Sequence, residues 1–484
     1  MQTPPARSLA PLRRLALTAA LAAAALAPVP ADAAPPSYAA PAVHAATAAP
    51  LAPAAAEAAD AALTKGRPHF RDGHGLHVVK ATRTSRREWH LVVATKQLER
   101  PVRVTILLPV GYGRTHRRYP SLYLFHGTSG GANDWVDMGR ARQTSRAFPF
   151  VVVMPDMGYD SNGGSFFTNW VDQETVLGTA NWETFHINQL VPWIDANLRT
   201  VRGRWGRAIA GLSQGGFGSF SYAARHPDLF VSAASFSGAP DIFEDPRARS
   251  IGTGIVSVIA TTLDGVPADA MFGDPATREL NWKGHNPASI VTNLADTDLA
   301  LWCGNGATGP YDEPSPTTPA GSGIEGLVHE STGYFVQAAD AAHVAYTYDD
   351  YGPGTHSWPY WARDLEQYLP QLRKVVREHR TRPASVSYRS VDKHWRQWGY
   401  RVRNHRSAAQ DWSMLDDATR SRFTLVAANP ATVRTPRAYR PGRTYTVSYR
   451  GGHGPHRVVA GHRGRLTLKV VPGAAGTVAV SVAR

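Results

Sequence analysis

The sequence contains a single cysteine, Cys303, among its 484 residues. No disulfide can form within one chain, so the folded state must depend on the large core that a chain of this length can build. Cys303 ends the short apolar run LALWC (299–303). That position predicts a buried, unreactive thiol rather than a nucleophile.

Long apolar runs are absent after the first thirty residues, which argues against a transmembrane span. Residues 1–33 contain a basic start, the apolar run 15–27 and a small-x-small cleavage site at Ala31–Ala33. This is the pattern of a signal peptide. Residues 34–65 are rich in alanine and proline and are typical of a flexible linker. We therefore expect a secreted, extracellular protein, with association to the cell wall left open.

Acidic residues are scarce in the last part of the chain. From Arg380 onward there are 20 Lys and Arg against 4 Asp and Glu, whereas the remainder holds 32 against 34. The basic character therefore belongs to the C-terminal segment. For an exported protein it indicates a cell-wall polyanion or glycan as partner rather than a nucleic acid. Four aromatic residues interleaved with the arginines could stack on sugars: Trp395, Trp398, Tyr400 and Trp412.

Residues 66–379 alternate between strand and helix patterns. Continuous apolar runs at 121–127, 148–156 and 207–211 are typical of buried parallel strands, and alternating runs within 76–110 suit an antiparallel sheet edge. Helical spacing follows at 181–198 and 217–227, and again around 324–341 and 359–378. This order predicts an α/β fold with a doubly wound, mostly parallel sheet. Residues 380–484 show short strands between Gly/Pro turns and predict a small all-β, sandwich-like C-terminal domain.

The motif G-x-S-x-G occurs twice, at GLSQG (211–215) and GTSGG (127–131). A nucleophile elbow needs a strand before it and a helix after it, and only Ser213 has both. Ser129 precedes a polar loop, and its stretch FHGTSGG suits the loop that supplies backbone N–H groups to an oxyanion. We therefore expect Ser213 to be the nucleophile and the N–H groups of Thr128 and Gln214 to form the oxyanion hole.

A serine nucleophile needs a base within hydrogen-bond reach. In this fold the chain order is serine, acid, histidine. His356, in PGTHSWPYW (353–361), lies in a loop after the predicted final strand and before the predicted terminal helix. It is therefore the expected base. The generic position for the acid, just after the preceding strand, holds Asp312.

Six blocks in this order resemble the secreted mycolyltransferases of the antigen 85 type and the wider esterase D family: GGSFFTNW (163–170), NWETF (181–185), GLSQGG (211–216), HPDLF (226–230), CGNG (303–306) and GTHSWPYW (354–361). The resemblance covers about residues 76–375. It implies an α/β-hydrolase fold with a Ser-Glu-His triad, in which Ser213 and His356 take the matching places. The register of HESTGYFV (329–336) implies Glu330 as the acid, in preference to Asp312.

The chain departs from the family in the loop that grips a sugar acceptor. His126 and Ser129 stand where those transferases have an aspartate and an arginine, whereas Trp358 is retained. We expect these three residues to contact substrate. The departure makes water at least as plausible an acyl acceptor as a carbohydrate. The sequence offers no metal-ligand cluster or dinucleotide loop, so no metal or organic cofactor is expected.

Three functions follow. The first is a carboxylic ester hydrolase acting on acyl esters through an acyl-enzyme, and the second is an acyltransferase that moves the acyl chain to a sugar or glycerol hydroxyl. The third is a non-catalytic wall-binding scaffold. Between residues 241 and 286, the apolar stretch 251–263 could line an acyl pocket or form a packed core helix.

Overall fold

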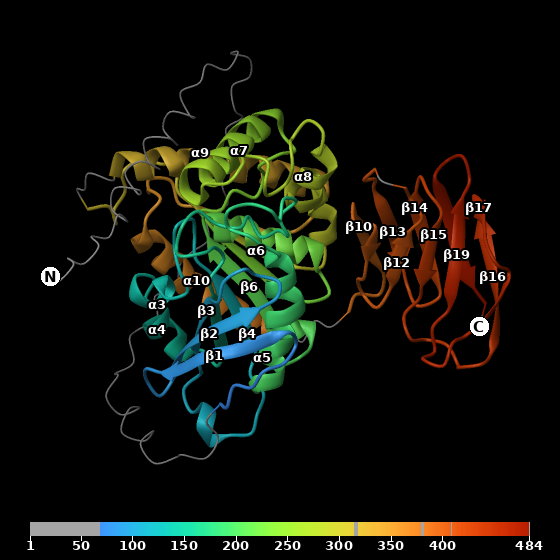
Figure 1. The fold of residues 1–484 in the computed structure, drawn as a ribbon, viewed down its shortest axis with the longest axis horizontal. Coiled ribbons are helices and arrows are strands. Elements are labelled where there is room, and N and C mark those ends of the chain that lie inside the picture. Colours follow the sequence, from blue (N-terminus) through green and yellow to red (C-terminus); the bar gives the residue numbers. More distant parts are fainter. Residues whose placement is uncertain (1–67, 314–317, 379–381, 408, 484) are drawn as a thin grey trace.

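The computed structural model describes residues 68–313, 318–378, 382–407 and 409–483. The predicted signal peptide and the predicted linker lie outside these residues. The described chain forms an α/β domain and a smaller β domain beside it (Figure 1). No helix among the described residues is long and apolar enough to cross a membrane.

A mixed sheet is the centre of the larger domain. Its strand order among the described residues is β1-β2-β3-β5-β4-β6-β7-β8-β9. The first three strands pair antiparallel, as predicted for the sheet edge, and β3 also pairs antiparallel with β5. From β5 across to β9 each strand runs parallel to the next. The strands are β1 Leu76–Arg83, β2 Glu88–Thr95, β3 Val102–Leu107, β4 Ser121–Phe125, β5 Val151–Pro155, β6 Arg207–Leu212, β7 Ser232–Phe236, β8 Asp298–Cys303 and β9 Thr347–Asp350.

Helices cover both faces of this sheet, which confirms the doubly wound α/β prediction. Alternate residues of the fully buried β4 enter two different cores, Tyr123 on one face and Leu122 on the other. The first core packs the helices η3 Thr184–Leu190, α5 Val191–Asn197, α6 Gln214–Arg225 and α9 Thr318–Ala341. The second packs α3 Asp134–Asp137, α4 Ala141–Thr144 and α10 Trp358–Arg377.

The segment between β7 and β8 is helical and belongs to the main core. It contains α7 Pro246–Val258, η5 Ile259–Asp264, α8 Glu279–His285 and η6 Ala288–Leu294. Val256, Ile259 and Leu263 are buried in the same cluster as α6. The apolar stretch 251–263 therefore forms packed core helices, the second of the two interpretations.

The C-terminal domain consists of two antiparallel sheets with one core between them, as the sequence predicts. The first sheet has the order β10-β13-β14-β20-β16-β18 and the second β11-β12-β15-β19-β17 within the described residues. The strands are β10 Val386–Ser390, β11 His394–Trp395, β12 Arg401–Asn404, β13 Ser413–Ala418, β14 Arg422–Ala427, β15 Ala431–Arg434, β16 Thr444–Arg450, β17 Gly452–His453, β18 Arg457–Val459, β19 Thr467–Pro472 and β20 Thr477–Val482.

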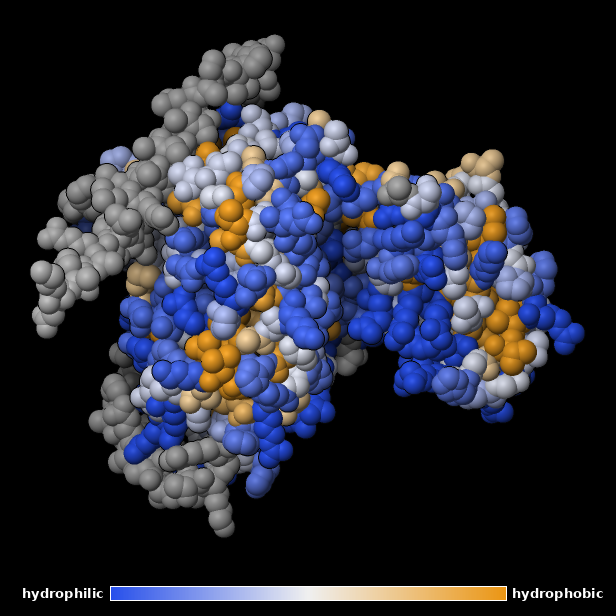
Figure 2. Space-filling model, in the orientation of Figure 1, coloured by the Kyte–Doolittle hydropathy of each residue, from blue (hydrophilic) through white to orange (hydrophobic). Residues whose placement is uncertain are grey.

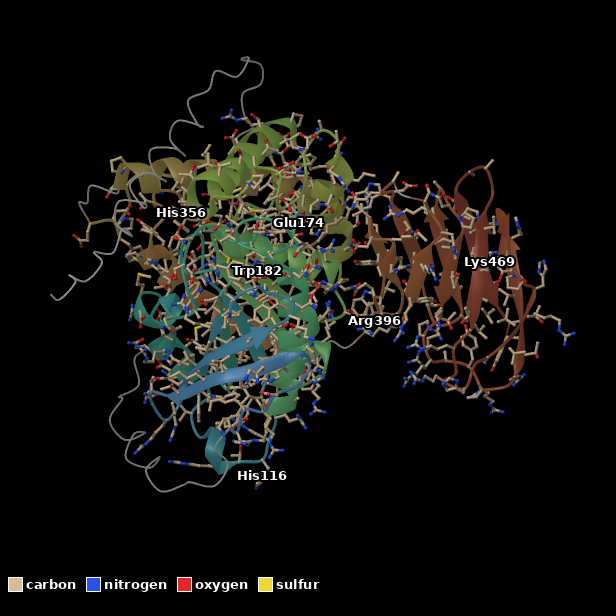
Figure 3. All side chains as sticks on the ribbon, in the orientation of Figure 1. His116, Glu174, Trp182, His356, Arg396 and Lys469 are labelled. Carbon is tan, nitrogen blue, oxygen red and sulfur yellow. The ribbon has the colours of Figure 1, made fainter. Side chains whose placement is uncertain are left out.

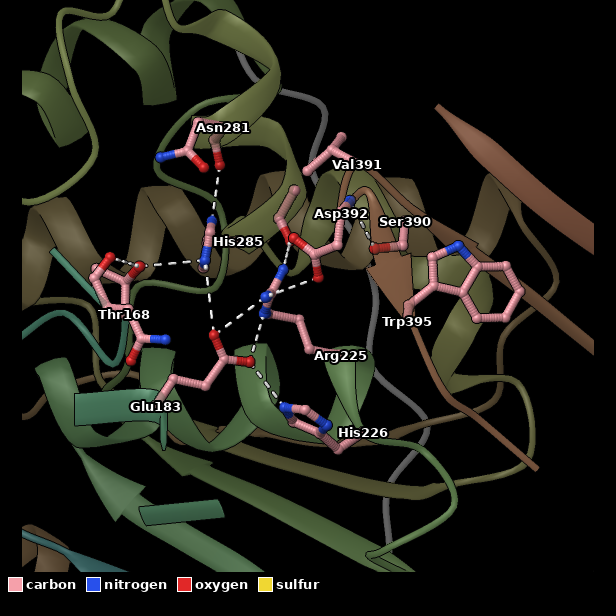
Figure 4. Close-up of polar contacts among 12 residues, drawn as sticks. Thr168, Glu183, Arg225, His226, Asn281, His285, Ser390, Val391, Asp392 and Trp395 are labelled. Atoms are coloured by element: carbon pink, nitrogen blue, oxygen red, sulfur yellow. Dashed lines mark hydrogen bonds and ion pairs between the residues drawn. The ribbon is translucent and has the colours of Figure 1, made fainter. Parts of the chain in front are cut away.

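A buried ionic cluster joins the two domains (Figure 4). Arg225 at the end of α6 donates two hydrogen bonds to Glu183, at 2.8 and 3.0 Å, and a third to Asp392 of the C-terminal domain at 3.1 Å. His226 contacts the same glutamate at 2.7 Å. Burial alone would raise the pKa of Glu183, but Arg225 and His226 together lower that pKa well below its usual range.

Neutral contacts around this cluster extend the junction. Asn293 exchanges two hydrogen bonds with the backbone of Arg389, its amide oxygen accepting at 2.9 Å and its amide nitrogen donating at 3.0 Å. Tyr388 and Gln397 both donate to the carbonyl oxygen of Arg225, at 2.8 and 2.7 Å. The C-terminal domain is therefore docked through buried polar groups rather than only joined by a linker.

Three of the four aromatic residues expected to stack on sugars are not available for that role. Trp395, Trp398 and Tyr400 are buried, the last at 1% exposure. Trp412 is half-buried against the main core of the larger domain, and the Arg389 guanidinium lies 3.9 Å from its ring centre. The expectation of sugar stacking is wrong for Trp395, Trp398 and Tyr400, because they are buried in the core of the C-terminal domain. For the half-buried Trp412 it stays a prediction.

Replacement of Arg225 by methionine should destabilise the whole chain. The variant leaves the buried Glu183 and the interfacial Asp392 without their common cation, a loss expected to cost about 3–5 kcal/mol of unfolding free energy. Chemical denaturation of the full chain measures this loss of unfolding free energy. Arg422→Met is the matched control, because Arg422 and its partner Asp417 are both exposed, and should change stability by less than about 1 kcal/mol. Equal losses in the two variants would contradict the role assigned to the cluster.

Candidate active site

Ser213 sits in a sharp turn between β6 and α6. Its backbone has φ 53° and ψ −127°, outside the regions that non-glycine residues normally occupy. The turn brings backbones so close that a Cβ on Gly211 would lie 2.5 Å from the carbonyl oxygen of Gly215, and one on Gly215 would lie 2.5 Å from that of His126. The glycines of GLSQG are therefore required by packing, and the segment has the strand–turn–helix geometry of a nucleophile elbow.

The predicted oxyanion residues meet beside this turn. The Gln214 side-chain amide donates to the Thr128 hydroxyl at 3.1 Å, and its amide oxygen accepts from the Phe166 N–H at 3.2 Å. Among the described residues, neither the Thr128 N–H nor the Gln214 N–H has a hydrogen-bond partner. Two unpaired donors next to a strained serine are what an oxyanion hole requires.

His126 does not face the site as expected. The side chain is 3% exposed. Its Nδ1 donates to the Gly127 carbonyl oxygen at 2.8 Å, and its Nε2 accepts from the Met157 N–H at 3.1 Å. Burial lowers the pKa of this imidazole, which keeps it neutral. The predicted substrate contact of His126 is wrong, because both ring nitrogens already hold the loop.

Ser129 continues the same loop in a left-handed conformation, at φ 57°. Its N–H donates to the Gly163 carbonyl oxygen at 2.9 Å, and its side chain is half-buried. Next to that contact, the buried Asp264 of η5 accepts from the Gly164 N–H at 3.2 Å. Burial raises the pKa of Asp264 to about 7, with the Gly164 hydrogen bond opposing the shift. The loop at 163–166 is thus hydrogen-bonded to both Ser129 and Gln214.

His356, which is labelled in Figure 3, is paired with Glu325, a residue of α9. The distance from His356 Nδ1 to Glu325 Oε2 is 2.6 Å, and the glutamate side chain is fully buried. Glu325 Oε1 also accepts from the Ser237 hydroxyl at 2.7 Å and the Gly304 N–H at 2.8 Å. Because the carboxylate Oε2 accepts a hydrogen bond from Nδ1, the neutral imidazole carries its proton on Nδ1. Its Nε2 is then unprotonated and can act as a base.

Glu330, which the resemblance favoured as the acid, lies on another side of the same helix. It accepts from Arg247 Nε at 3.0 Å and from the Tyr334 hydroxyl at 3.2 Å, and its side chain is 35% exposed. Five residues of α-helix correspond to a rotation of about 140°, so a side chain at 330 cannot share the direction of one at 325. The prediction that Glu330 contacts His356 is wrong.

Asp312 does not contact the imidazole ring of His356 either, but it holds the loop beside it. It accepts from the Thr355 hydroxyl, from the Tyr360 hydroxyl at 3.0 Å and from the Gly309 N–H at 2.8 Å. It therefore supports the backbone next to His356 rather than the ring.

A sequence signal for Glu325 existed and was missed. The buried residues of α9 include 325, 328, 332, 335 and 339, which follow helical spacing. A glutamate on the buried stripe of a helix needs a partner inside the protein. Glu330 falls outside this stripe. The helix predicted at 324–341 already contains both glutamates, and its buried stripe singles out Glu325.

Trp358 begins α10, two residues after His356. Its half-buried ring packs edge-to-face against Trp135 at 5.4 Å and Trp361 at 5.3 Å, and Trp361 in turn contacts the His356 ring at 4.9 Å. The cluster fixes the loop that carries the histidine. The expected contact of Trp358 with substrate stays a prediction.

Adjacent parallel strands bring these parts to one edge of the sheet. Ser213 follows β6, Ser237 follows β7, Gly304 follows β8, and the His356 loop follows β9. The Ser213 N–H donates to the Phe236 carbonyl oxygen at 2.9 Å, and the Ser237 N–H donates to the Trp302 carbonyl oxygen at 2.8 Å. No hydrogen bond joins Ser213 to His356 within the described chain. Catalytic hydrogen bonds of this kind often tighten only with substrate bound.

The prediction for Cys303 can be compared with this site. Cys303 is buried, and burial together with the nearby Glu325 raises the pKa of its thiol, so it is unreactive as predicted. In the part of the chain that the structure describes, no group of three or more His, Cys, Asp or Glu side chains could hold a metal ion.

The α/β domain has relatives among known proteins. Residues 95–372 match the Esterase family. The chain is 40% identical over 235 residues to Esterase Rv1288 of Mycobacterium tuberculosis, covering 48% of this chain and 49% of the relative. It is 30% identical over 266 residues to the diacylglycerol acyltransferase/mycolyltransferase Ag85B of Mycobacterium leprae, covering 53% of this chain and 76% of the relative.

Among solved structures, MPT51 of Mycobacterium tuberculosis matches with 26% identity and a TM-score of 0.47, covering 59% of this chain and 97% of that one. The chain spans about half the length of the esterase relative that it matches. The family match covers more than half of the chain and includes Ser213, Glu325 and His356. The chain therefore belongs to the Esterase family, and antigen 85 mycolyltransferases are among the proteins to which it is similar.

Proposed function

We propose that this chain is an exported serine esterase that hydrolyses acyl esters through Ser213, His356 and Glu325. The observation that carries the proposal is the pairing of His356 with the fully buried Glu325, at the sheet edge where Ser213 occupies a strained elbow. A buried carboxylate that accepts from an imidazole Nδ1 beside such a serine is the arrangement of an acyl-transfer triad.

In the first half-reaction, Ser213 Oγ attacks the ester carbonyl carbon while His356 Nε2 takes the hydroxyl proton. Glu325 stabilises the resulting imidazolium through the Nδ1 hydrogen bond. The carbonyl oxygen becomes an oxyanion that accepts from the Thr128 and Gln214 N–H groups. Collapse of this intermediate breaks the bond to the leaving alcohol, which receives the proton from His356.

In the second half-reaction, His356 takes a proton from a water molecule that attacks the acyl-enzyme carbonyl. The tetrahedral intermediate then releases the carboxylic acid and returns the proton to Ser213 Oγ. Both steps use the same donors and the same base, so no cofactor is needed.

Transfer of the acyl group to a sugar or glycerol hydroxyl is the second candidate. It is favoured by the 30% identity to a mycolyltransferase over 76% of that relative. The position where the family resemblance implies a sugar-gripping aspartate holds His126, whose ring is buried and fully hydrogen-bonded. That difference makes water the preferred acceptor in this proposal. Export rests on the pattern of residues 1–33.

Loss of Ser213 should abolish the reaction. Ser213→Ala is expected to lower kcat by about 10⁴- to 10⁶-fold, because the nucleophile is removed, and to prevent labelling by a fluorophosphonate probe. Ester turnover and probe labelling measure both effects. Ser129→Ala, the serine of the other G-x-S-x-G match, is the control and should still label. A wild-type protein that does not label would favour the non-catalytic scaffold instead.

Replacing each of the two glutamates of α9 by glutamine should have very different effects on kcat. Glu325→Gln is expected to lower kcat by about 10³- to 10⁴-fold with little change in KM, because the histidine loses its negatively charged orienting partner. Glu330→Gln removes one partly exposed ion pair and should change kcat by less than about threefold. Steady-state kinetics on both variants, with circular dichroism to establish folding, makes the comparison. A larger loss in Glu330→Gln would reverse the assignment.

The acyl acceptor can be identified from the products. With a soluble acyl ester, wild-type protein should release mainly free carboxylic acid, and adding a disaccharide or glycerol should leave the acid as the major product. Chromatography of the products with and without each acceptor measures the partition. An acylated sugar formed faster than free acid would establish the transferase instead.

A further inference from the structure

The outer face of the second sheet of the C-terminal domain carries a row of exposed cations. Arg401 and Arg403 of β12, Arg434 of β15 and Lys469 of β19 are exposed, while Val402, Val433 and Leu468 between them point into the core. The strand register sets Arg401 opposite Arg434. It also sets Thr432 between Arg403 on one side and Lys469 on the other. We call these four cations the basic face.

Nothing on this sheet neutralises the basic face. None of its five strands contains an aspartate or a glutamate, and the sequence has no acidic residue after Asp417. In the described part of the chain, none of the four cations forms an ion pair. Of the nearest carboxylates in sequence, Asp392 contacts Arg225, Asp411 accepts from the Trp412 N–H at 2.8 Å, and Asp417 contacts Arg422 of the other sheet. The face therefore presents four uncompensated charges to solvent.

Arginines in the flanking loops extend the charge. Arg396 and Arg437 are exposed, and Arg465 donates to the carbonyl oxygens of Gly399 and Thr435 at 2.5 and 2.6 Å. Burial lowers the pKa of Arg465, and repulsion from Arg401, Arg437, Arg434 and Arg396 lowers it further. Figure 3 places Lys469 on this domain and Arg396 at the end nearest the larger domain. Figure 2 shows a strongly hydrophilic surface on the part of the C-terminal domain next to the larger one.

Neighbouring strands lie about 4.8 Å apart, so the sheet holds its cations in rows with spacings of about 5–10 Å. Such a row can contact several charges of one extended polymer at once. Arginine supplies a planar fork of donors that matches phosphate oxygens. The aromatic side chains that would stack on sugars or bases, Trp395, Trp398 and Tyr400, are buried beneath this sheet. These features favour recognition of charge along a backbone rather than of rings.

We propose that the basic face binds a phosphodiester polymer outside the cell, of the poly(glycerol phosphate) kind, and so holds the esterase at an anionic surface. The proposal goes beyond the ester chemistry and takes from the proposed function only the export of the chain. Binding would release counterions, so affinity must fall with salt. Four phosphate contacts predict an affinity about 50-fold lower at 200 mM than at 50 mM salt.

The test measures binding of purified poly(glycerol phosphate) to the full chain by fluorescence titration at several salt concentrations. The combined variant Arg401→Gln, Arg403→Gln, Arg434→Gln and Lys469→Gln should bind at least about tenfold more weakly at low salt and show a shallower salt dependence. The control carries the same change of net charge on the other sheet and its β13–β14 turn: Arg420→Gln, Arg422→Gln, Arg450→Gln and Arg457→Gln. It should bind as the wild type does.

Each other outcome overturns a specific part of the proposal. Equal losses in the two variants would mean that net charge, not this face, attracts the polymer. Equal or tighter binding of polyglutamate would exclude phosphate selectivity, and equal or tighter binding of single-stranded DNA would make a nucleic acid the partner. Wild-type protein that does not bind would refute the proposal outright. Ser213→Ala should keep full affinity, so a failure of the esterase proposal remains distinguishable from a failure of this one.

Discussion

The site depends on the hydrogen bonds that the buried carboxylate of Glu325 accepts. A negative charge removed from water is costly unless hydrogen-bond donors surround it. Here the donors come from separate parts of the chain: Ser237 after β7, Gly304 after β8 and His356 after β9. Satisfying one carboxylate therefore fixes the position of three strand ends and one helix relative to one another. The imidazole is oriented by the same contacts that hold this edge of the sheet together.

The strained elbow at Ser213 is the second constraint, and it is linked to the first through the backbone. The Ser213 N–H bonds to Phe236, the residue before Ser237. The glycines on either side of Ser213 permit contacts that any side chain would block. On the other side, Gln214 connects the elbow to Thr128 and to the loop at 163–166. Serine, oxyanion donors and histidine are thus positioned by one continuous set of contacts at the carboxyl ends of parallel strands.

Much of this arrangement could be predicted from the sequence, because the signals are local. The apolar runs gave the parallel strands, and the strand–serine–helix context distinguished Ser213 from Ser129. Chain order singled out His356 among the histidines. The acid was misplaced because its position was taken from the register of the family resemblance, whereas the helical spacing puts only Glu325 on the buried stripe of the helix that carries both glutamates. The predicted substrate contact of His126 is wrong because sequence position does not reveal that both ring nitrogens form hydrogen bonds with the backbone. Three of the aromatic residues of the last domain were misjudged because strand alternation does not say which face a second domain or sheet will cover.

The central claim is that Glu325 orients His356 by accepting its Nδ1 proton. Proton NMR of the full chain at low temperature measures this bond directly, because a strongly hydrogen-bonded imidazole proton gives a resonance far downfield of the amide region. The account predicts such a resonance in the wild type, its loss in Glu325→Gln, and its retention in Glu330→Gln. A downfield resonance that persists unchanged in Glu325→Gln would contradict the account.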